Sequence, residues 1–199
     1  MTQNVTLTPK DLRAFTNEVK ELFNSGQIHS PVHLSAGNES ELIEIFKEVK
    51  PTDWVFSTHR SHYHALLRGI PREWLREQIL QNRSMHINSK EHRFFTSAIV
   101  GGACPIALGV ALGIKRRSGP EHVWCFVGDM AAKTGIFYES ARYAGGFDLP
   151  ITFVVEDNGF SVNTPTAESW GLQPLNGKVR YYEYTRLLPH SGTGRWIAF

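Results

Sequence analysis

Apolar side chains recur at helical spacing near the start of the chain, at Leu12, Phe15 and Val19. This spacing places them on one face of an amphipathic helix. Thr8 and Pro9 come directly before the pattern. A threonine N-cap followed by proline in the first turn is a typical helix start. The pattern therefore predicts a first helix that begins at residue 9.

The rest of the first third of the chain also favours helices. Similar patterns predict helices near residues 39–49 and 71–80. Residues 58–64, which contain histidines and an arginine, are expected to form a loop, and residues 81–96 an irregular stretch. We therefore expect a helical N-terminal extension over about residues 1–80.

The middle of the chain changes pattern. Residues 122–127 and 151–155 are short, continuous apolar runs, which are typical of buried parallel strands. Residues 131–145 between them predict a helix, and this β-α-β order favours a parallel sheet with a right-handed crossover. The Gly/Ala-rich residues 99–116 predict a tightly packed helix after a glycine turn.

The C-terminal part continues this pattern. Residues 178–185 alternate like a later strand, and residues 195–199 could form a short terminal one. The prediction is an α/β fold in three layers, with a parallel sheet and helices on both faces. The length of 199 residues favours one domain over residues 1–199.

Composition narrows the function classes. A net charge of +2 gives no reason to expect nucleic acid or an anionic membrane as partner. No apolar run reaches membrane-spanning length, and the polar N-terminus does not read as a signal peptide, so we expect a cytoplasmic protein. Cys104 and Cys125 lie in apolar surroundings and are expected to be buried, reduced thiols.

Two polar motifs end the two apolar runs of the β-α-β unit. Gly128-Asp129 follows the first run, and Asn158 lies 29 residues after Asp129, at the end of the second. Both positions should meet at the carboxyl edge of the sheet, where open sheets bind ligands. Asp129 alone could merely cap a helix. Together, a carboxylate and an amide oxygen suit Mg²⁺, which usually also holds a phosphate, and the amides that follow Asp129 could bind that phosphate.

This region resembles the α subunit of thiamine-diphosphate-dependent 2-oxo acid dehydrogenases, the E1 component of the pyruvate dehydrogenase type. The motif of that family is Gly-Asp-Gly, then roughly thirty residues, then Asn-Asn. The resemblance implies that Asp129, the side-chain oxygen of Asn158 and the backbone carbonyl of Phe160 bind Mg²⁺. It implies that Gly128, Met130 and Ala131 lie at the cofactor.

Other segments resemble the same family. Residues 28–35, 59–62, 84–86, 98–101 and 185–191 look like its Gly-x-x-His-Leu, Tyr-Arg-Ala-His, Ser-Met-His, Gly-Ile-Val-Gly and Tyr-Arg-x-x-x-His-Ser segments. By resemblance, the residues that would bind thiamine diphosphate further include His59, Arg60, Ala98, Val100 and Arg186. The histidines that would donate protons or bind a substrate carboxylate are His62, His86 and His190.

Other interpretations of the histidines remain. A zinc site formed by His59, His62 and His64 is an alternative, but no cysteine or other fourth ligand lies nearby in the sequence. His64 and His92 are otherwise expected at the surface.

The chain departs from the family pattern at several positions. Met130 replaces the last glycine of Gly-Asp-Gly, where the backbone closely approaches phosphate. Lys133 and Asp157 replace asparagines, and His59 replaces a tyrosine. Family α subunits are also longer, so the domain is expected to be either compact or degenerate.

Two hypotheses follow. The first is a subunit of a thiamine-diphosphate- and Mg²⁺-dependent enzyme that decarboxylates a small 2-oxo acid or transfers the resulting C2 unit. It would need a β-type pyrimidine-binding subunit that supplies the activating glutamate, with α₂β₂ as the expected assembly. The second is a non-catalytic, degenerate relative with a structural or regulatory role. A nucleotide- or NAD-binding domain has little support, because no G-x-G-x-x-G opens a helix after a strand.

Overall fold

The computed structural model describes residues 7–171 and 179–195. Its centre is a five-stranded parallel sheet with the order β2-β1-β3-β4-β7. The central pair is the two apolar runs: β3 (Val123–Gly128) lies beside β4 (Ile151–Asp157) with Gly128 opposite Glu156. The other three strands are β1 (Trp54–Ser57), β2 (Phe94–Thr96) and β7 (Val179–Glu183).

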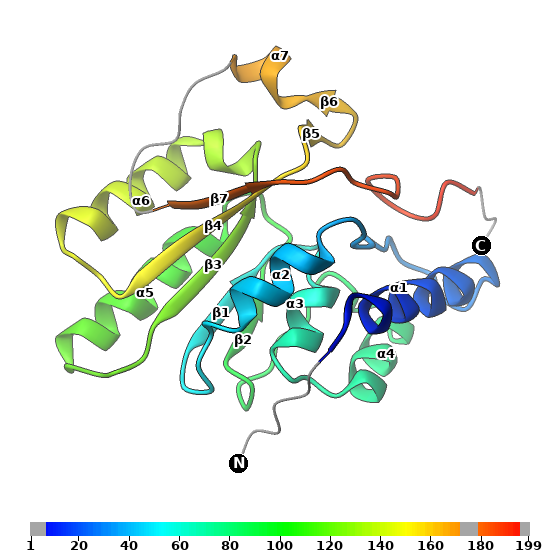
Figure 1. The fold of residues 1–199 in the computed structure, drawn as a ribbon, viewed down its shortest axis with the longest axis horizontal. Coiled ribbons are helices and arrows are strands. Elements are labelled where there is room, and N and C mark those ends of the chain that lie inside the picture. The colour runs from blue at the N-terminus through cyan, green and yellow to red at the C-terminus, as the bar shows by residue number, and fades with distance from the viewer. Residues whose placement is uncertain (1–6, 172–178, 196–199) are drawn as a thin grey trace.

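Side chains of β3 alternate between two hydrophobic cores, one on each face of the sheet. Trp124 and Phe126 join the core formed with the helices between residues 9 and 80, whereas Val123, Cys125 and Val127 join the core formed with the helices over residues 103–116 and 135–146. Figure 1 shows these two helical layers on opposite sides of the strands. The predicted three-layer α/β fold is therefore confirmed.

The helices follow the amphipathic patterns. Thr8 caps the first helix: its hydroxyl accepts a bond from the backbone of Asp11, whose side chain bonds back to the amide of Thr8. The helices are α1 (Pro9–Asn24), α2 (Glu39–Phe46), α3 (His62–Leu67), α4 (Arg72–Leu80), α5 (Ala103–Arg116), α6 (Gly135–Gly146) and α7 (Thr166–Trp170).

Three local predictions need correction. The part of the chain expected to be helical also contains β1, which lies between β2 and β3 in the sheet. The stretch 81–96, expected to be irregular, ends in β2. The loop expected over 58–64 gives way to α3 at His62. These elements are only four, three and six residues long, too short for a periodic pattern to stand out.

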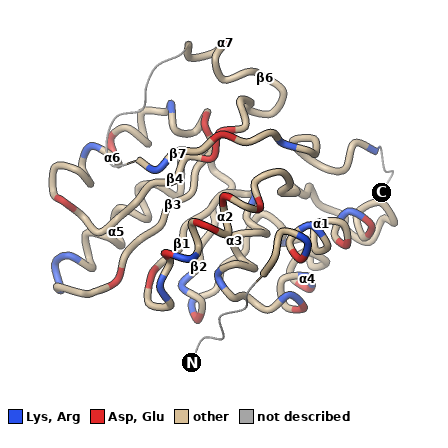
Figure 2. Tube along the Cα trace, in the orientation of Figure 1, with Lys and Arg blue, Asp and Glu red and all other residues tan. Residues whose placement is uncertain are grey.

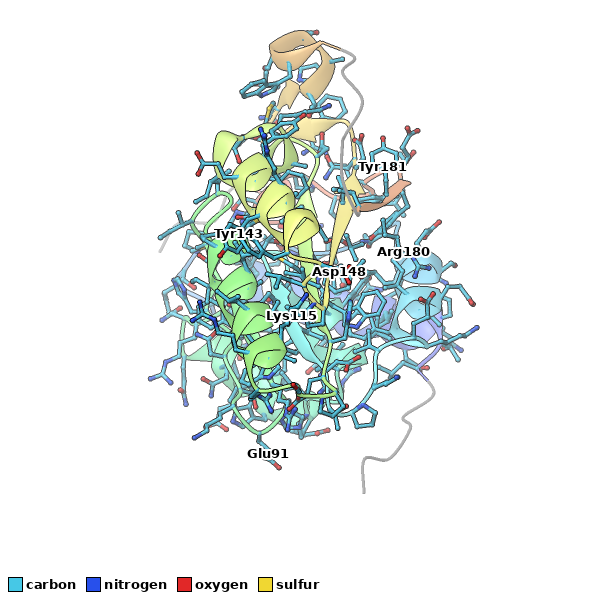
Figure 3. All side chains as sticks on the ribbon, turned by 90° about the vertical axis from the view of Figure 1, so that its left-hand side faces the viewer. Glu91, Lys115, Tyr143, Asp148, Arg180 and Tyr181 are labelled. Atoms are coloured by element: carbon cyan, nitrogen blue, oxygen red, sulfur yellow. The ribbon has the colours of Figure 1, made fainter. Side chains whose placement is uncertain are left out.

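The layer formed by α5 and α6 faces the viewer in Figure 3. Lys115, near the end of α5, donates hydrogen bonds to the carbonyls of Phe147 (2.5 Å) and Asp148 (3.2 Å). These bonds tie α5 to the turn between α6 and β4. Arg180 and Tyr181, on the edge strand β7, lie to the right of this layer in the same view.

The chain beyond β4 leaves the sheet, and β7 later joins the edge of the sheet beside β4. A small hairpin of β5 (Phe160–Ser161) and β6 (Thr164–Pro165) leads into α7, and these elements stand above the sheet in Figure 1. After β7, the chain runs back towards α1 (Figure 1). There the amide of Gly192 donates to the carbonyl of Val32 at 2.9 Å.

Other expectations can be compared with the described residues. Cys104 and Cys125 are both buried and free, as predicted. The terminal strand expected over 195–199 lies outside the described residues apart from Arg195. Within the described part of the chain, no helix is long and apolar enough to cross a membrane. Lysines, arginines and acidic residues are mixed over most of the trace, while acidic residues gather where β4 and β7 end (Figure 2).

Candidate functional site

A cavity opens at the carboxyl edge of the parallel sheet. Its walls come from the ends of β1, β3 and β4, from the turn before α5, from the β5–β6 hairpin and from the segment after β7. Parallel strands bring their carboxyl ends to one edge, so residues from distant parts of the sequence meet there. The lining residues are Thr58, His59, Arg60, Ser97, Ile99, Val100, Gly101, Ala103, Val127, Gly128, Asp129, Met130, Ala131, Glu156, Asn158, Phe160, Ser161, Val162, Tyr184 and His190.

Most of the residues predicted for the site line this cavity. Of the predicted positions, ten are in the lining: His59, Arg60, Val100, Gly128, Asp129, Met130, Ala131, Asn158, Phe160 and His190. The four that are absent from it are His62, His86, Ala98 and Arg186.

Asp129 follows directly after β3 and is only 3% exposed. The hydroxyl of Thr166, at the start of α7, donates a hydrogen bond to its carboxylate. Burial raises the pKa of Asp129, and the nearby charge of Asp157 acts in the same direction, while the bond from Thr166 opposes them. No lysine or arginine among the described residues forms an ion pair with it. A bound cation would compensate this buried carboxylate.

The turn after β4 presents the amide side chain of Asn158. Asn158 Oδ1 accepts a hydrogen bond from the amide of Phe160 (3.1 Å), and its Nδ2 donates to the Tyr184 hydroxyl (3.2 Å). Gly159 has φ +75°, a conformation that favours glycine, and its amide donates to Asp157 Oδ1 at 2.7 Å. The side-chain oxygen of Asn158 is thus oriented by the turn and keeps a second lone pair for a metal.

The chain between Asp129 and α6 differs from the prediction. A helix was expected from residue 131, but α6 begins at Gly135, and a 3₁₀ turn, η1 (Ala131–Lys133), precedes it. Met130 has right-handed helical backbone angles, φ −67° and ψ −39°. The backbone conformation at this position therefore does not require the glycine of the family motif. Met130 is half-buried and is one of the residues that line the cavity.

Two arginines stand near the cavity. Arg60 donates hydrogen bonds to the carbonyls of Leu34 and His190, the latter at 2.9 Å. Arg186 donates to the carbonyl of Val162 at 2.7 Å, and its guanidinium lies 4.8 Å from the ring centroid of Phe160. Arg60 is thus in the cavity wall, whereas Arg186 lies against the β5–β6 hairpin that forms the rim.

Several residues of the wall were not predicted from the sequence. Glu156 accepts hydrogen bonds from Asn38 Nδ2 (3.1 Å) and from the Tyr182 hydroxyl (2.5 Å), and it lies 3.3 Å from Nε2 of His64. Tyr184 comes directly after β7, so the rule that placed Asp129 and Asn158 at the sheet edge could also have found it. Thr166 gave no such signal, because only the folded hairpin brings it to Asp129.

The histidines divide into distinct environments. His59 and His190 line the cavity. His62 is fully buried, its Nε2 is 2.9 Å from Ser84 Oγ, and burial lowers its pKa to about 4. His86 is exposed and lies outside the lining set.

His64 corrects two expectations. It was expected at the surface but is 1% exposed, with Nδ1 2.9 Å from Ser57 Oγ. Hydrogen bonds to Ser84 and Ser57 hold the rings of His62 and His64 in the protein interior, on α3. The alternative zinc site of His59, His62 and His64 is therefore wrong, since these three side chains do not converge. His92, also expected at the surface, is half-buried beside Ser89.

The turn before α5 supplies an apolar part of the wall. Ile99 and Val100 are 76% and 65% exposed although they line the cavity. Gly101 has φ +71°, and a side chain there would collide with Ile136. Ala98 belongs to the same turn but is not in the lining.

Comparison with known proteins gives matches over most of the chain. The model of the family described as "Dehydrogenase E1 component" matches residues 9–182. The α subunit of the acetoin:2,6-dichlorophenolindophenol oxidoreductase of Bacillus subtilis is 32% identical over 165 residues, covering 78% of this chain and 50% of that protein. The chloroplastic pyruvate dehydrogenase E1 component subunit alpha-3 of Arabidopsis thaliana is 30% identical over 187 residues. The match covers 83% of this chain and 44% of that protein.

A third relative is also an alpha subunit. The pyruvate dehydrogenase E1 component subunit alpha of Zymomonas mobilis is 30% identical over 164 residues, covering 77% of this chain and 46% of that protein. All three relatives are named as alpha subunits, and the chain spans about half the length of these curated relatives.

Proposed function

Because this chain belongs to the dehydrogenase E1 component family, we propose that it binds thiamine diphosphate and Mg²⁺ as the α-type part of an enzyme acting on a 2-oxo acid. The enzyme would decarboxylate the acid or transfer the resulting C2 unit. One relative is named after acetoin, which is a hydroxyketone, and two are named after pyruvate, which is a 2-oxo acid. The 2-oxo acid in the proposal follows the two pyruvate enzymes.

The observation that carries the proposal is the buried carboxylate of Asp129 beside Asn158. Both line the same cavity, and Asp129 has no cationic partner among the described residues. Carboxylate, amide and carbonyl oxygens are the ligands that Mg²⁺ prefers. Asp129, Asn158 Oδ1 and the carbonyl of Phe160 would hold the ion, which in turn would hold the diphosphate.

The diphosphate also needs cationic and hydrogen-bonding partners. Arg60 and His59 stand in the wall, and Arg186 stands at the rim beside Phe160. A guanidinium suits a phosphate because it can donate two parallel hydrogen bonds. Gly128, Met130 and Ala131 would contribute the backbone that approaches the phosphates, and Ala98 and Val100 would support the aminopyrimidine.

When bound, thiamine diphosphate supplies the nucleophilic carbon and the electron sink for loss of CO₂ from a 2-oxo acid. The role of the chain is to bind, orient and move protons. Among the histidines proposed for catalysis, His190 has the position that best supports the role, since it lines the cavity. His62, held by Ser84, and His86, on the surface, would need a rearrangement or the partner subunit to take part.

A β-type subunit is part of the proposal. It would supply the glutamate that activates the aminopyrimidine, in an α₂β₂ assembly. The apolar side chains of Ile99 and Val100 support this, because both residues are exposed and line the cavity. Exposed apolar residues that rim a binding site often mark a protein interface.

The alternative is a non-catalytic relative with a structural or regulatory role. One observation favours it: Met130 lines the cavity where the family motif has glycine. The two functions differ in whether the cofactor binds.

Calorimetry separates them. The full chain, alone and mixed with a β-type subunit from the same organism, is titrated with thiamine diphosphate in the presence and absence of Mg²⁺. Mg²⁺-dependent binding supports the enzyme subunit. An absence of binding in both preparations rules it out and leaves the non-catalytic role.

A further inference from the structure

Three histidines from distant parts of the chain converge beside the cavity. His33 comes from the loop before α2, His59 follows β1, and His190 follows β7. One ring nitrogen of each lies within 4.8 Å of the corresponding nitrogens of the other two. The ring centroids are separated by 4.4 Å (His33–His59), 5.0 Å (His33–His190) and 5.7 Å (His59–His190), and the rings meet edge to face.

Backbone contacts fix the three segments relative to one another. Arg60, next to His59, donates hydrogen bonds to the carbonyl of Leu34, next to His33, and to the carbonyl of His190 itself. The segment after β7 also lies against the loop around His33. The amide of Gly192 donates to the Val32 carbonyl. The cluster is therefore built by the fold, as a preorganised site requires.

The imidazoles are in the chemical form that binds metals. Burial lowers the pKa of His33 to about 3 and that of His59 to about 4, and it also lowers the pKa of His190; the charge of Arg60 acts in the same direction. All three rings are therefore neutral at pH 7, and each offers a nitrogen lone pair. Nδ1 of His33 is buried and has no hydrogen-bond partner among the described residues.

We propose that His33, His59 and His190 form a binding site for a divalent transition-metal ion of the zinc class, distinct from the oxygen-ligand site at Asp129 and Asn158. Imidazole nitrogen suits zinc, copper and nickel, whereas Mg²⁺ prefers oxygen. Three histidines with a fourth position open to water are one of the known ligand sets of zinc. The ion would bind the chain without thiamine diphosphate, because His59 and His190 are also the residues proposed above for the diphosphate and for proton transfer.

The geometry needs only a small closure. Zinc–nitrogen bonds of about 2.0–2.1 Å in a tetrahedron place the nitrogens roughly 3.3–3.4 Å apart. The three nitrogens lie within 4.8 Å of one another, so coordination would need the half-buried rings of His59 and His190 to move towards His33. The two half-buried rings also line the cavity, so the fourth coordination position faces it.

The surrounding charges determine the fourth ligand. Arg60 acts on all three histidines, and Arg186 acts on His190. Two nearby positive charges weaken the binding of a bare cation and favour a complex that carries an anion, such as hydroxide, chloride or phosphate, in the open position.

Metal binding is measured directly on the full chain, without Mg²⁺ or thiamine diphosphate. Zn²⁺ is titrated by calorimetry, and Co²⁺ is titrated by visible absorption, where tetrahedral nitrogen coordination gives intense bands. We expect one ion per chain. His59→Phe and His190→Gln should each weaken Zn²⁺ binding by about a hundredfold or more, since even loss of an outer-shell partner typically costs 10–100-fold.

Two controls keep the result specific. His29→Gln removes an exposed histidine from the loop that contains His33 and should leave the affinity unchanged. Asp129→Asn should keep the Zn²⁺ affinity while it loses Mg²⁺-dependent cofactor binding, so failure of this proposal and failure of the cofactor proposal are separate results. Thermal melting identifies any variant that does not fold. Because His59 and His190 lie in different segments of the chain, the proposal can still be tested with one variant if the other does not fold.

The proposal is overturned by any of three results. These are a wild-type chain that binds no stoichiometric Zn²⁺, folded His59→Phe and His190→Gln variants that bind as tightly as wild type, and a loss of Zn²⁺ affinity in folded Asp129→Asn.

Discussion

Thr166 donates a hydrogen bond to the carboxylate of Asp129 across 37 positions of sequence. The bond exists because the β5–β6 hairpin folds back after β4: the amide of Thr166 also donates to the carbonyl of Gly159 at 2.9 Å. This hydrogen bond lowers the pKa of Asp129, whereas burial raises it. Thr166 therefore helps to keep Asp129 ionised in the place where a cation would bind.

The first prediction tests this bond. Thr166→Val removes the donor while it keeps the shape, so the pKa of Asp129 rises further and Mg²⁺ competes with a proton over a wider pH range. A hydrogen bond to a charged group is worth about 1.5–3 kcal/mol, so Mg²⁺-dependent binding should weaken by roughly tenfold or more at neutral pH. Calorimetry between pH 6 and 8 measures the Mg²⁺-dependent binding. Thr166→Ser keeps the hydroxyl and should restore binding. Thr164→Val, at an exposed position of the hairpin, serves as the control. Unchanged binding in Thr166→Val would show that the hydroxyl does not support the site.

The second prediction concerns Asp129 itself. Asp129→Asn removes the charge but keeps the size, so Mg²⁺-dependent binding of thiamine diphosphate should be abolished, and Asp129→Ala should give the same result. Because the buried carboxylate has no cationic partner among the described residues, Asp129→Asn should not lower the melting temperature. Glu73→Gln, an exposed position on α4, is the matched control. Full affinity in Asp129→Asn would mean that the metal ligand is misassigned.

The third prediction addresses Met130. Met130→Gly restores the residue of the family motif and removes a side chain from the cavity wall, so we expect thiamine diphosphate to bind more tightly. The substitution costs about 0.5–1 kcal/mol of unfolding free energy from backbone entropy alone, because glycine loses more backbone freedom on folding. Loss of the half-buried methionine side chain adds to this cost. Calorimetry and urea unfolding measure the two effects. Equal affinity in both proteins would show that the methionine does not obstruct the phosphates.

The fourth prediction is an acid-dependent loss of stability through His62. Its pKa is about 4 in the folded protein because of burial, against 6.5 in the unfolded chain. The unfolded state binds the proton first, so stability is complete above pH 6.5 and falls as the pH decreases towards 4. The full effect is about 3 kcal/mol, at about 1.4 kcal/mol per pKa unit.

Urea unfolding at several pH values measures this dependence. His62→Gln should reduce the pH slope by one proton equivalent. Ser84→Ala removes the hydrogen-bond partner but keeps the imidazole, so it should lower stability and retain the slope. An identical slope in wild type and His62→Gln would contradict the assignment.

The fifth prediction uses two glycines with positive φ. A side chain on Gly37 (φ +101°) would lie 2.2 Å from the carbonyl oxygen of Thr185, whereas one on Gly26 (φ +73°) would meet open space. Gly26→Ala should cost about 1–2 kcal/mol from backbone strain alone. Gly37→Ala should cost about 3 kcal/mol or more, because the segment after β7 must also move. Similar losses in both variants would show that this contact is not tight.

Much of the fold can be predicted from local patterns of the sequence. The helix start at Thr8, the two buried strands and the helix between them depend on periodicity within a few residues. The rule that parallel strands end at one edge then placed Asp129 and Asn158 in one cavity. The short strands β1 and β2 were not predicted, because they contain too few residues for their pattern to differ from that of a loop.

The sequence by itself determined the α/β architecture, the strand ends that form the cavity and the family. Only the tertiary structure decided which side chains meet across loops: Thr166 with Asp129, His64 with Glu156, and His33 with His59 and His190. The physical reason is the range of the interactions. Secondary structure follows from neighbours along the chain, whereas the position of a loop side chain depends on the packing of every element beneath it.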